Sequence, residues 1–147
     1  MAKKKTERQK AKEAAWAAFS IYIRTRDCIR FSGDPTLGKC VTCNIAKPFK
    51  ELQAGHFIQG RGNAVLFDDR LVYSQCFGCN GNPPRGKGGN YVEYFLFMLR
   101  EGYTNEELEE FNNLKSTTIK YKIHEFIELK EEFKSLTKEL LNNLKEK

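Results

Sequence analysis

The sequence lacks any apolar run long enough to cross a bilayer, and it contains only two histidines and one tryptophan among 147 residues. A membrane-spanning helix needs about 20 predominantly apolar residues, so an integral membrane protein is excluded. The basic start of the chain is followed by a charged, amphipathic segment instead of the apolar core of a signal peptide. We therefore expect a soluble protein without a membrane partner that stays in the cytosol where it is made.

Cysteine is scarce as well, and its odd count argues against a framework of disulfides. Four of the five cysteines form two C-x-x-C pairs, Cys40 with Cys43 and Cys76 with Cys79. Two such pairs present four thiolates at about 2.3 Å from one Zn²⁺. We predict a structural zinc there, with iron in the same site, metal-free thiols or a redox pair as alternatives. Cys28 is left over, and we expect it to be a packed, inert thiol.

Acidic residues are few in the first two-thirds of the chain. Residues 1–102 hold 17 Lys and Arg against 9 Asp and Glu, whereas residues 103–147 hold 8 against 10. The first part therefore favours an anionic partner, most simply nucleic acid, and the tail does not. The basic side chains at positions 3–5, 8, 10 and 12 either lie along phosphates or form a solvated terminus.

Periodicity and turn signals divide the chain into a basic N-terminal helix and lead-in at 1–39, a site-bearing module at 40–102 and a helical region at 103–147. The first helix is expected over residues 7–27, with turn residues at 32–35 after it. Within the module we expect a strand over 52–58 and a second extended segment over 65–73 that a turn interrupts. Residues 81–89 read as an irregular loop.

The last part of the chain is expected to be helical. A strongly apolar helix follows Asn90 and ends at Gly102, and Thr104 with Glu107 forms a capping box for the next helix. Apolar side chains then recur every three or four positions over residues 117–145, which predicts one helix about 40 Å long. Such a helix either packs on the N-terminal helix or pairs with a second chain, and we favour a homodimer.

His56 has the clearest chemistry of any single residue, because it lies between the two cysteine pairs in a basic module. Histidine is the usual general base near neutral pH. The alternative is a half-buried histidine at the end of a strand. His124 lies in the long charged helix, where surface or interfacial packing is its ordinary role.

Several segments, taken in this order, resemble the NinG/Rap group of phage recombination nucleases: C-x-x-C at 40–43, A-G-H-F-I at 54–58, F-D-D-R-L-V-Y-S-Q-C-F-G-C-N at 67–80 and G-G-N-Y-V-E-Y at 88–94. Residues 21–27 are also similar to that group's lead-in helix. The group belongs to the HNH, or ββα-metal, endonucleases, which include the endonuclease VII type. The resemblance implies an α+β, mainly helical chain whose zinc-pinned HNH module is flanked by an N-terminal and a long C-terminal helix.

The resemblance also implies roles for individual residues. His56 falls on the family's general base, which takes a proton from the attacking water. Asn80 falls on the position that binds the catalytic metal, Mg²⁺ or Mn²⁺, although Asn is also a common cap or turn residue. The other candidate ligands of that metal are Asn90, Gln53, Asp68 and Asp69. The candidate DNA contacts are Arg61, Arg85 and Lys87.

The sequence departs from the HNH pattern at two positions. Gly55 stands where these enzymes commonly have an Asp that supplies a metal ligand, and the NinG group shares this A-G-H form. Leu71 stands where an Asn normally ties the hairpin loops together, and Asn63 is the candidate substitute. Both departures bear on activity more than on the fold.

Three functions compete at this point. The first is a metal-dependent DNA endonuclease that acts in phage recombination by hydrolysing phosphodiester bonds in branched DNA, either junctions or flaps. The second is a catalytically inactive, zinc-containing DNA-binding module, which Gly55 and Leu71 favour. The third is an interaction protein whose long helix is the working part.

Overall fold

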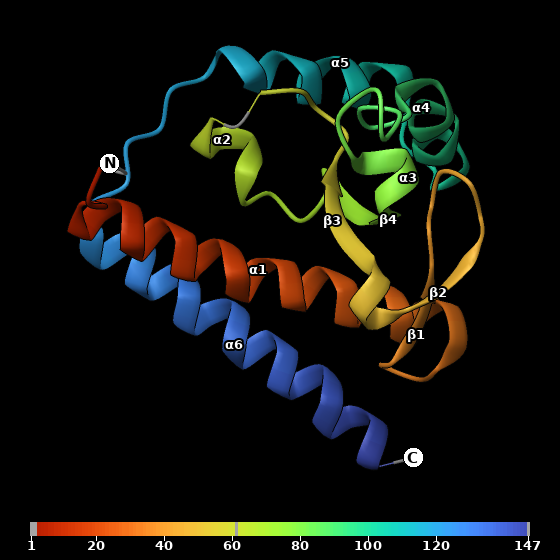
Figure 1. Cartoon of the computed structure of the whole chain (residues 1–147), viewed down its shortest axis with the longest axis horizontal. Helices are drawn as coiled ribbons and strands as arrows, with labels where there is room; N and C mark the ends of the chain where they lie inside the picture. The colour runs from red at the N-terminus through yellow and green to blue at the C-terminus, as the bar shows by residue number, and fades with distance from the viewer. Residues whose placement is uncertain (1–2, 61, 147) are drawn as a thin grey trace.

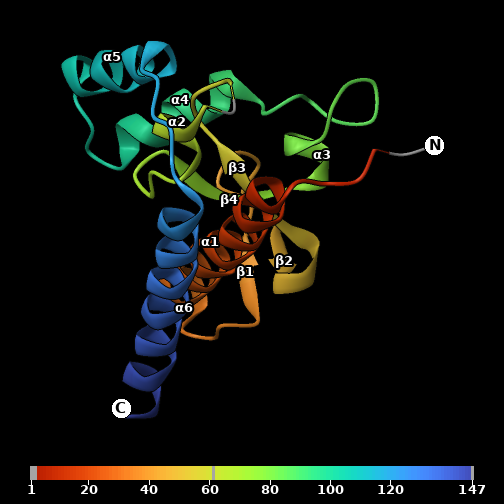
Figure 2. The ribbon, with the colours of Figure 1, turned by 90° about the vertical axis from the view of Figure 1, so that its left-hand side faces the viewer.

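The computed structural model describes residues 3–60 and 62–146, and the chain is α+β with mostly helical content (Figure 1). Two antiparallel sheets of two strands each lie beside a pair of packed helices, α1 and α6, and α4 and α5 lie beyond the sheets (Figures 1 and 2). The helices are α1 (Glu7–Ser32), α2 (Asn63–Leu66), α3 (Phe77–Asn80), α4 (Tyr91–Arg100), α5 (Asn105–Asn113) and α6 (Ile123–Lys145), with single 3₁₀ turns at Phe49–Glu51 and Leu114–Ser116. The strands are β1 (Leu37–Lys39), β2 (Ala46–Pro48), β3 (Leu52–His56) and β4 (Val72–Cys76).

Helix α1 begins and ends at local signals. The Thr6 hydroxyl accepts a hydrogen bond from the Gln9 N–H at 3.1 Å, and the Gln9 side chain accepts one from the Thr6 N–H at 2.8 Å. Gly33 ends the helix in the left-handed conformation, with φ 76°. The helix continues past residue 27, where we expected its end, because Cys28 is also fully buried on its inner face.

The sheet that carries the expected base pairs β3 with β4, and His56 lies opposite Val72 at one end of the ladder. Strand β3 ends at His56, two positions before the expected end. The expected extended segment over 65–73 is wrong in its first half, because Val65 and Leu66 are buried by a turn of helix, α2. A short apolar run has the same appearance in a strand and in a buried helix, so periodicity did not distinguish them.

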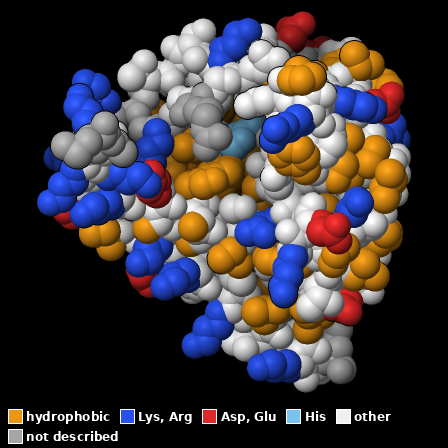
Figure 3. Space-filling model, viewed as in Figure 1, with side chains coloured by type: hydrophobic (Ala, Val, Ile, Leu, Met, Phe, Trp, Pro, Cys, Tyr) orange, Lys and Arg blue, Asp and Glu red, His pale blue; other side chains and the backbone are white. Residues whose placement is uncertain are grey.

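The prediction is confirmed for α4 and for the cap of α5, where the Thr104 hydroxyl and the Glu107 N–H lie 3.1 Å apart. The long helix is shorter than expected. It begins at Ile123 and not at residue 117, because the segment before it is extended and the Lys122 N–H donates to the Glu125 carboxylate as a cap. Helix α6 packs along α1 within one chain, and Lys and Arg side chains border the molecule along it (Figure 3).

One hydrophobic core joins the elements. It contains Phe19 of α1, Leu71 before β4, Tyr94 of α4 and Phe126 of α6, each at most 1% exposed. The β3–β4 sheet lies against α1, which fixes the end of β3 relative to that helix. None of the helices described is both long and apolar enough to span a membrane.

Candidate metal centre and adjoining hollow

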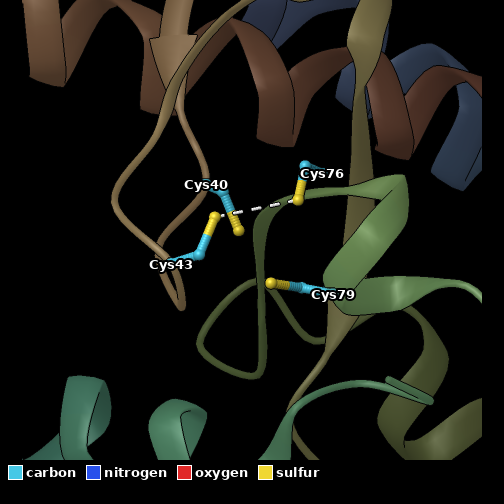
Figure 4. A group of neighbouring side chains, drawn as sticks. All are labelled: Cys40, Cys43, Cys76 and Cys79. Atoms are coloured by element: carbon cyan, nitrogen blue, oxygen red, sulfur yellow. Dashed lines mark hydrogen bonds between the residues drawn. The ribbon is translucent and has the colours of Figure 1, made fainter. Parts of the chain in front are cut away.

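The four cysteines of the two C-x-x-C pairs converge on one point, as the spacing predicted. Their Sγ atoms all lie within 4.8 Å of one another, and the sulfurs of Cys43 and Cys76 are 3.8 Å apart (Figure 4). Cys40 and Cys79 are buried, whereas Cys43 and Cys76 are half-buried. Four thiolates in this arrangement suit a tetrahedral metal ion such as zinc.

Each pair is shaped by its own backbone. The loop from Cys40 to Ile45 folds back on itself, with Asn44 in the left-handed conformation at φ 64° and its N–H on the Cys40 carbonyl. The second pair spans the end of β4 and the short helix α3. Burial raises the pKa of the Cys40 thiol, but the Thr42 hydroxyl and nearby backbone N–H groups outweigh it and lower that pKa to about 7. The net shift is opposite for two other thiols of the cluster, because burial raises the pKa of Cys43 to about 12 and also raises the pKa of Cys76. Cys40 is thus the thiol of these three that most readily forms the thiolate, which is the form that binds metal.

Cys28 is not part of this cluster. Its side chain is fully buried in the core, and burial together with the Asp27 carboxylate raises the pKa of its thiol to about 11. A thiol that stays protonated and inaccessible is unreactive, as the sequence led us to expect.

The imidazole of His56 is held from two sides. Its ring stacks on the Trp16 indole of α1, with ring centroids 5.1 Å apart and an angle of 22° between the planes. Its Nε2 lies 3.2 Å from the carbonyl oxygen of Leu66. Because a carbonyl oxygen only accepts, this hydrogen bond requires the proton on Nε2. A neutral ring then carries its lone pair on Nδ1, so Nδ1 is the basic atom.

A surface hollow of about 410 Å³ joins His56 to Asn80. The Asn80 amide nitrogen donates to the Gln53 side-chain oxygen at 2.8 Å, so these two residues of β3 and α3 are fixed together. None of the described residues that line the hollow is Asp or Glu; the lining comprises Gln53, Ala54, His56, Ile58, Gln59, Gly60, Phe77, Asn80, Gly81, Asn82, Gly88 and Tyr91. The hollow is therefore a neutral surface of amides, backbone and two aromatic rings with one imidazole.

The other candidate metal ligands lie elsewhere. Asn90 places its amide nitrogen 3.5 Å from the Cys79 sulfur, so it belongs to the cysteine cluster and not to the hollow. Asp68 and Asp69 line a separate hollow against α6, and the Asp68 carboxylate accepts from Arg70 at 2.6 Å. Of the alternatives, only Gln53 shares the hollow with His56.

The candidate DNA contacts are exposed where the structure describes them. Arg85 and Lys87 lie on the irregular loop after α3, and both side chains are exposed. Arg61 lies outside the described residues. Asn63, the candidate substitute for the missing Asn of the pattern, donates to the Ile119 carbonyl at 2.9 Å and so ties α2 to the segment before α6.

Comparison with known families decides the relationship. The sequence matches the family described as Bacteriophage Lambda NinG protein over residues 1–143. The chain belongs to the NinG family. No curated protein and no solved structure matches it.

In this NinG-family chain, packing explains why the residue before His56 is a glycine. A Cβ on Gly55 would lie 1.8 Å from the Oε1 of Gln75. The Gln75 side chain is fully buried, and its amide nitrogen donates to the Thr42 hydroxyl at 3.1 Å and to the Gly89 carbonyl at 2.8 Å. Gln75 thus ties the first cysteine loop to the second and occupies the space where an Asp at position 55 would project.

Contacts from α1 and α4 hold the backbone on both sides of Leu71 and at Gly55. Leu71 is fully buried, and its carbonyl accepts from the Phe57 N–H at 2.8 Å. Arg26 donates to the backbone carbonyls of Asp69 and Val72 at 2.9 and 2.8 Å. The Tyr94 hydroxyl donates to the Gly55 carbonyl at 2.6 Å, beside the histidine.

The Asp27 carboxylate adds a further tie, because it accepts from the Ser74 N–H of β4 at 2.8 Å. Sequence reasoning gave no role to Arg26, Asp27, Tyr94 or Trp16. Arg26 and Asp27 lie in the lead-in helix at 21–27 and Tyr94 lies in the segment 88–94, both of which resemble the NinG/Rap group, whereas no such signal marked Trp16.

Proposed function

We propose that this NinG-family protein is a metal-dependent endonuclease that hydrolyses phosphodiester bonds in branched DNA during phage recombination. The observation that carries the proposal is the arrangement of His56, whose Nε2 faces the Leu66 carbonyl at 3.2 Å. The His56 imidazole takes a proton from a water molecule, and the water oxygen bonds to phosphorus while the bond to the 3′ oxygen breaks. Trp16 fixes the plane of the ring during this transfer.

A divalent cation, when bound beside the scissile phosphate, stabilises the charge that develops on the leaving oxygen. The amide oxygens of Asn80 and Gln53 are hard donors that suit Mg²⁺ or Mn²⁺. Amide oxygens alone bind such ions weakly, and Mg²⁺ is usually held by one or two carboxylates together with substrate phosphates. Because no described residue of the hollow is a carboxylate, Asn80 and Gln53 would hold such an ion only together with a phosphate of the DNA.

The same neutrality suits a polyanionic substrate, since a phosphate entering the hollow meets no negative side chain among its described residues. Arg85 and Lys87, both exposed on the adjoining loop, supply positive charge for the DNA backbone. We infer that the cysteine cluster holds a structural zinc. Because Cys79 directly precedes Asn80 and the loop that carries Arg85 and Lys87, this zinc fixes the start of that loop.

Branched DNA is favoured over plain duplex by Phe77. Its side chain is 50% exposed, lines the hollow and packs on one side against Gly81. An exposed aromatic ring beside a reactive centre offers a stacking surface to a base that has lost a stacking neighbour. Such a base is present on the single strand of a flap or at the branch point of an opened junction, but not inside a duplex.

The test is a cleavage assay on a four-way junction, a flap and a plain duplex, each with Mg²⁺, with Mn²⁺ and with EDTA. We expect metal-dependent cutting of the branched substrates, with 5′-phosphate and 3′-hydroxyl ends. Absence of cutting on all three substrates with both metals would contradict the endonuclease.

The second candidate is a zinc-containing DNA-binding module without catalysis. It is favoured by Gly55, because Gln75 excludes the acidic ligand that HNH enzymes commonly place there. It predicts salt-sensitive binding of the same substrates without cleavage.

A further inference from the structure

A groove between α1 and α6, on the part of the molecule farthest from α4 and α5, has no role in the proposed function (Figure 1). Its hollow measures about 700 Å³, and small side chains of α1 form its floor: Ala14, Ala17 and Ala18. Ile21 and Leu141 extend the floor. Ile21 is 42% exposed, so part of the apolar floor is open to solvent.

One rim of the groove is basic. Lys130, Lys134, Lys138 and Lys145 follow one another at spacings of four, four and seven residues, which places them on one edge of α6 over about 22 Å. None of the ion pairs between described residues involves any of the four. Lys and Arg side chains follow this outer border of the molecule in Figure 3.

Most of the negative charge of α6 lies away from the lysines. Of its five glutamates, those at 125, 128, 132 and 139 fall on the opposite flank, whereas Glu131 lies next to Lys138 around the helix. Residues 103–147 hold more acidic than basic residues, yet the charged residues that line the groove are all lysines. The net charge of the segment therefore hides a basic edge beside an apolar floor.

These two features select one kind of occupant. A second copy that docked the same groove about a two-fold axis would bring lysine rim against lysine rim, which is repulsive. A DNA backbone would pair with the lysines but would gain nothing from the alanine and isoleucine floor. An amphipathic helix with an apolar face and acidic edges satisfies both the floor and the rim.

We propose that the α1–α6 groove docks an acidic amphipathic helix of about 15 residues from a partner protein, a length that matches the lysine rim. The bulky apolar side chains of the partner, three and four residues apart, fill the space that the alanines leave. Its carboxylates pair with Lys134 and Lys138, which are both exposed. This binding does not depend on the nuclease activity proposed above.

The test uses the full-length chain and three fluorescent peptides of about 15 residues. One carries apolar residues on a single helical face and Glu elsewhere, the second has the same composition in scrambled order, and the third has Lys in place of Glu. We expect only the first to bind saturably, and we expect its affinity to fall at least about tenfold between low and high salt.

Two variants probe the two features separately. The double reversal Lys134→Glu with Lys138→Glu removes charge from the rim, and Ala17→Phe fills the floor without changing any charge. Each is expected to weaken binding of the first peptide by about tenfold or more. The matched control, Lys115→Glu with Lys120→Glu, makes the same charge change away from the groove and is expected to leave binding unchanged. Circular dichroism verifies that each variant is folded.

Several outcomes would overturn the proposal. Equal binding of the scrambled peptide, or no saturable binding of the first, would show that the groove does not select an amphipathic acidic helix. A dimer in sedimentation that Ala17→Phe dissociates would assign the groove to a second copy. Loss of DNA affinity in the lysine reversal but not in Ala17→Phe would assign the rim to nucleic acid.

Discussion

The cysteine cluster and the hollow beside it are joined by one peptide bond, between Cys79 and Asn80, yet their side chains offer different ligand atoms. The cluster offers four thiolates, two of them buried, and needs nothing from outside the chain to surround a metal. The hollow offers an imidazole and side-chain amides with no carboxylate among its described residues. The cluster therefore has the ligands of a structural metal site, whereas the cation site proposed in the hollow would need a phosphate of the DNA.

The largest effect is expected from breaking the cluster. Cys40→Ala removes a buried ligand of the proposed zinc site, so we expect the loss of the metal and of the folded module, because metal binding energy in such sites is folding energy. Mass spectrometry measures the metal content, and thermal unfolding measures the loss of folded structure. Cys28→Ala is the matched control, since that thiol is also buried but lies outside the cluster. It is expected to retain zinc and to lose about 1 kcal/mol of stability through a small cavity.

Removing the proposed general base, His56, tests the hollow. His56→Ala is expected to lower the cleavage rate by about 10²–10⁴-fold, the usual cost of losing a general base, with zinc content unchanged. His124→Ala, an exposed change on α6, is expected to cleave at the parent rate. Equal rates for the parent and His56→Ala would refute the assigned base.

Adding a carboxylate to the hollow sharpens the comparison. Gln53→Glu gives the neutral site one negative ligand, and Mn²⁺ is then expected to bind without DNA about tenfold or more tightly than it binds the parent chain. Isothermal titration with Mn²⁺ measures this. The exposed Gln59→Glu, at the border of the same hollow but without a contact to Asn80, controls for charge alone.

The glycine before the histidine gives a smaller, steric effect. Gly55→Asp forces the new side chain against Gln75, so we expect a loss of about 1–3 kcal/mol in the free energy of unfolding. The double variant Gly55→Asp with Gln75→Ala opens that space, and a double-mutant cycle in urea should show a favourable coupling between the two positions. Additive losses would mean that Gln75 does not exclude the acid.

The smallest predicted effect concerns substrate choice. Phe77→Leu keeps the contact with Gly81 but loses the aromatic face, so the preference for junction over duplex should fall by about tenfold. The ratio of the two affinities measures it, whether or not the chain cleaves. Phe77→Trp is expected to retain the preference, and a ratio unchanged in Phe77→Leu would exclude stacking.

The sequence predicted the features that are local. The cysteine pairs, the capping box at Thr104 and the apolar face of α4 each depend on residues a few positions apart, and the structure confirms them. The helix predicted over residues 117–122 was wrong. Apolar spacing alone did not reveal that β-branched Thr117, Thr118 and Ile119 precede a new helix cap. The extended segment predicted from residue 65 was wrong at its start, because a short apolar run fits both a strand and a buried helix.

The surroundings of the candidate base were beyond sequence reasoning for a physical reason. Trp16 and His56 are separated by 40 residues in the chain and meet only because α1 packs on β3. The pairing of Gln53 with Asn80 likewise needs the register of β3 against β4. Contacts between residues so far apart in the chain depend on tertiary packing, and the spacing of residues in the sequence does not predict them.

Counting metal ions tests the contrast between cluster and hollow most directly. Native mass spectrometry of the full-length chain with zinc and Mn²⁺, alone and with a phosphorothioate junction that resists cleavage, reports each bound ion. We predict one zinc in both states and one additional Mn²⁺ only with the junction, and we predict that Asn80→Ala abolishes the additional ion. A Mn²⁺ ion bound to the chain without DNA, or none bound in the complex, would contradict a cation site that the substrate completes.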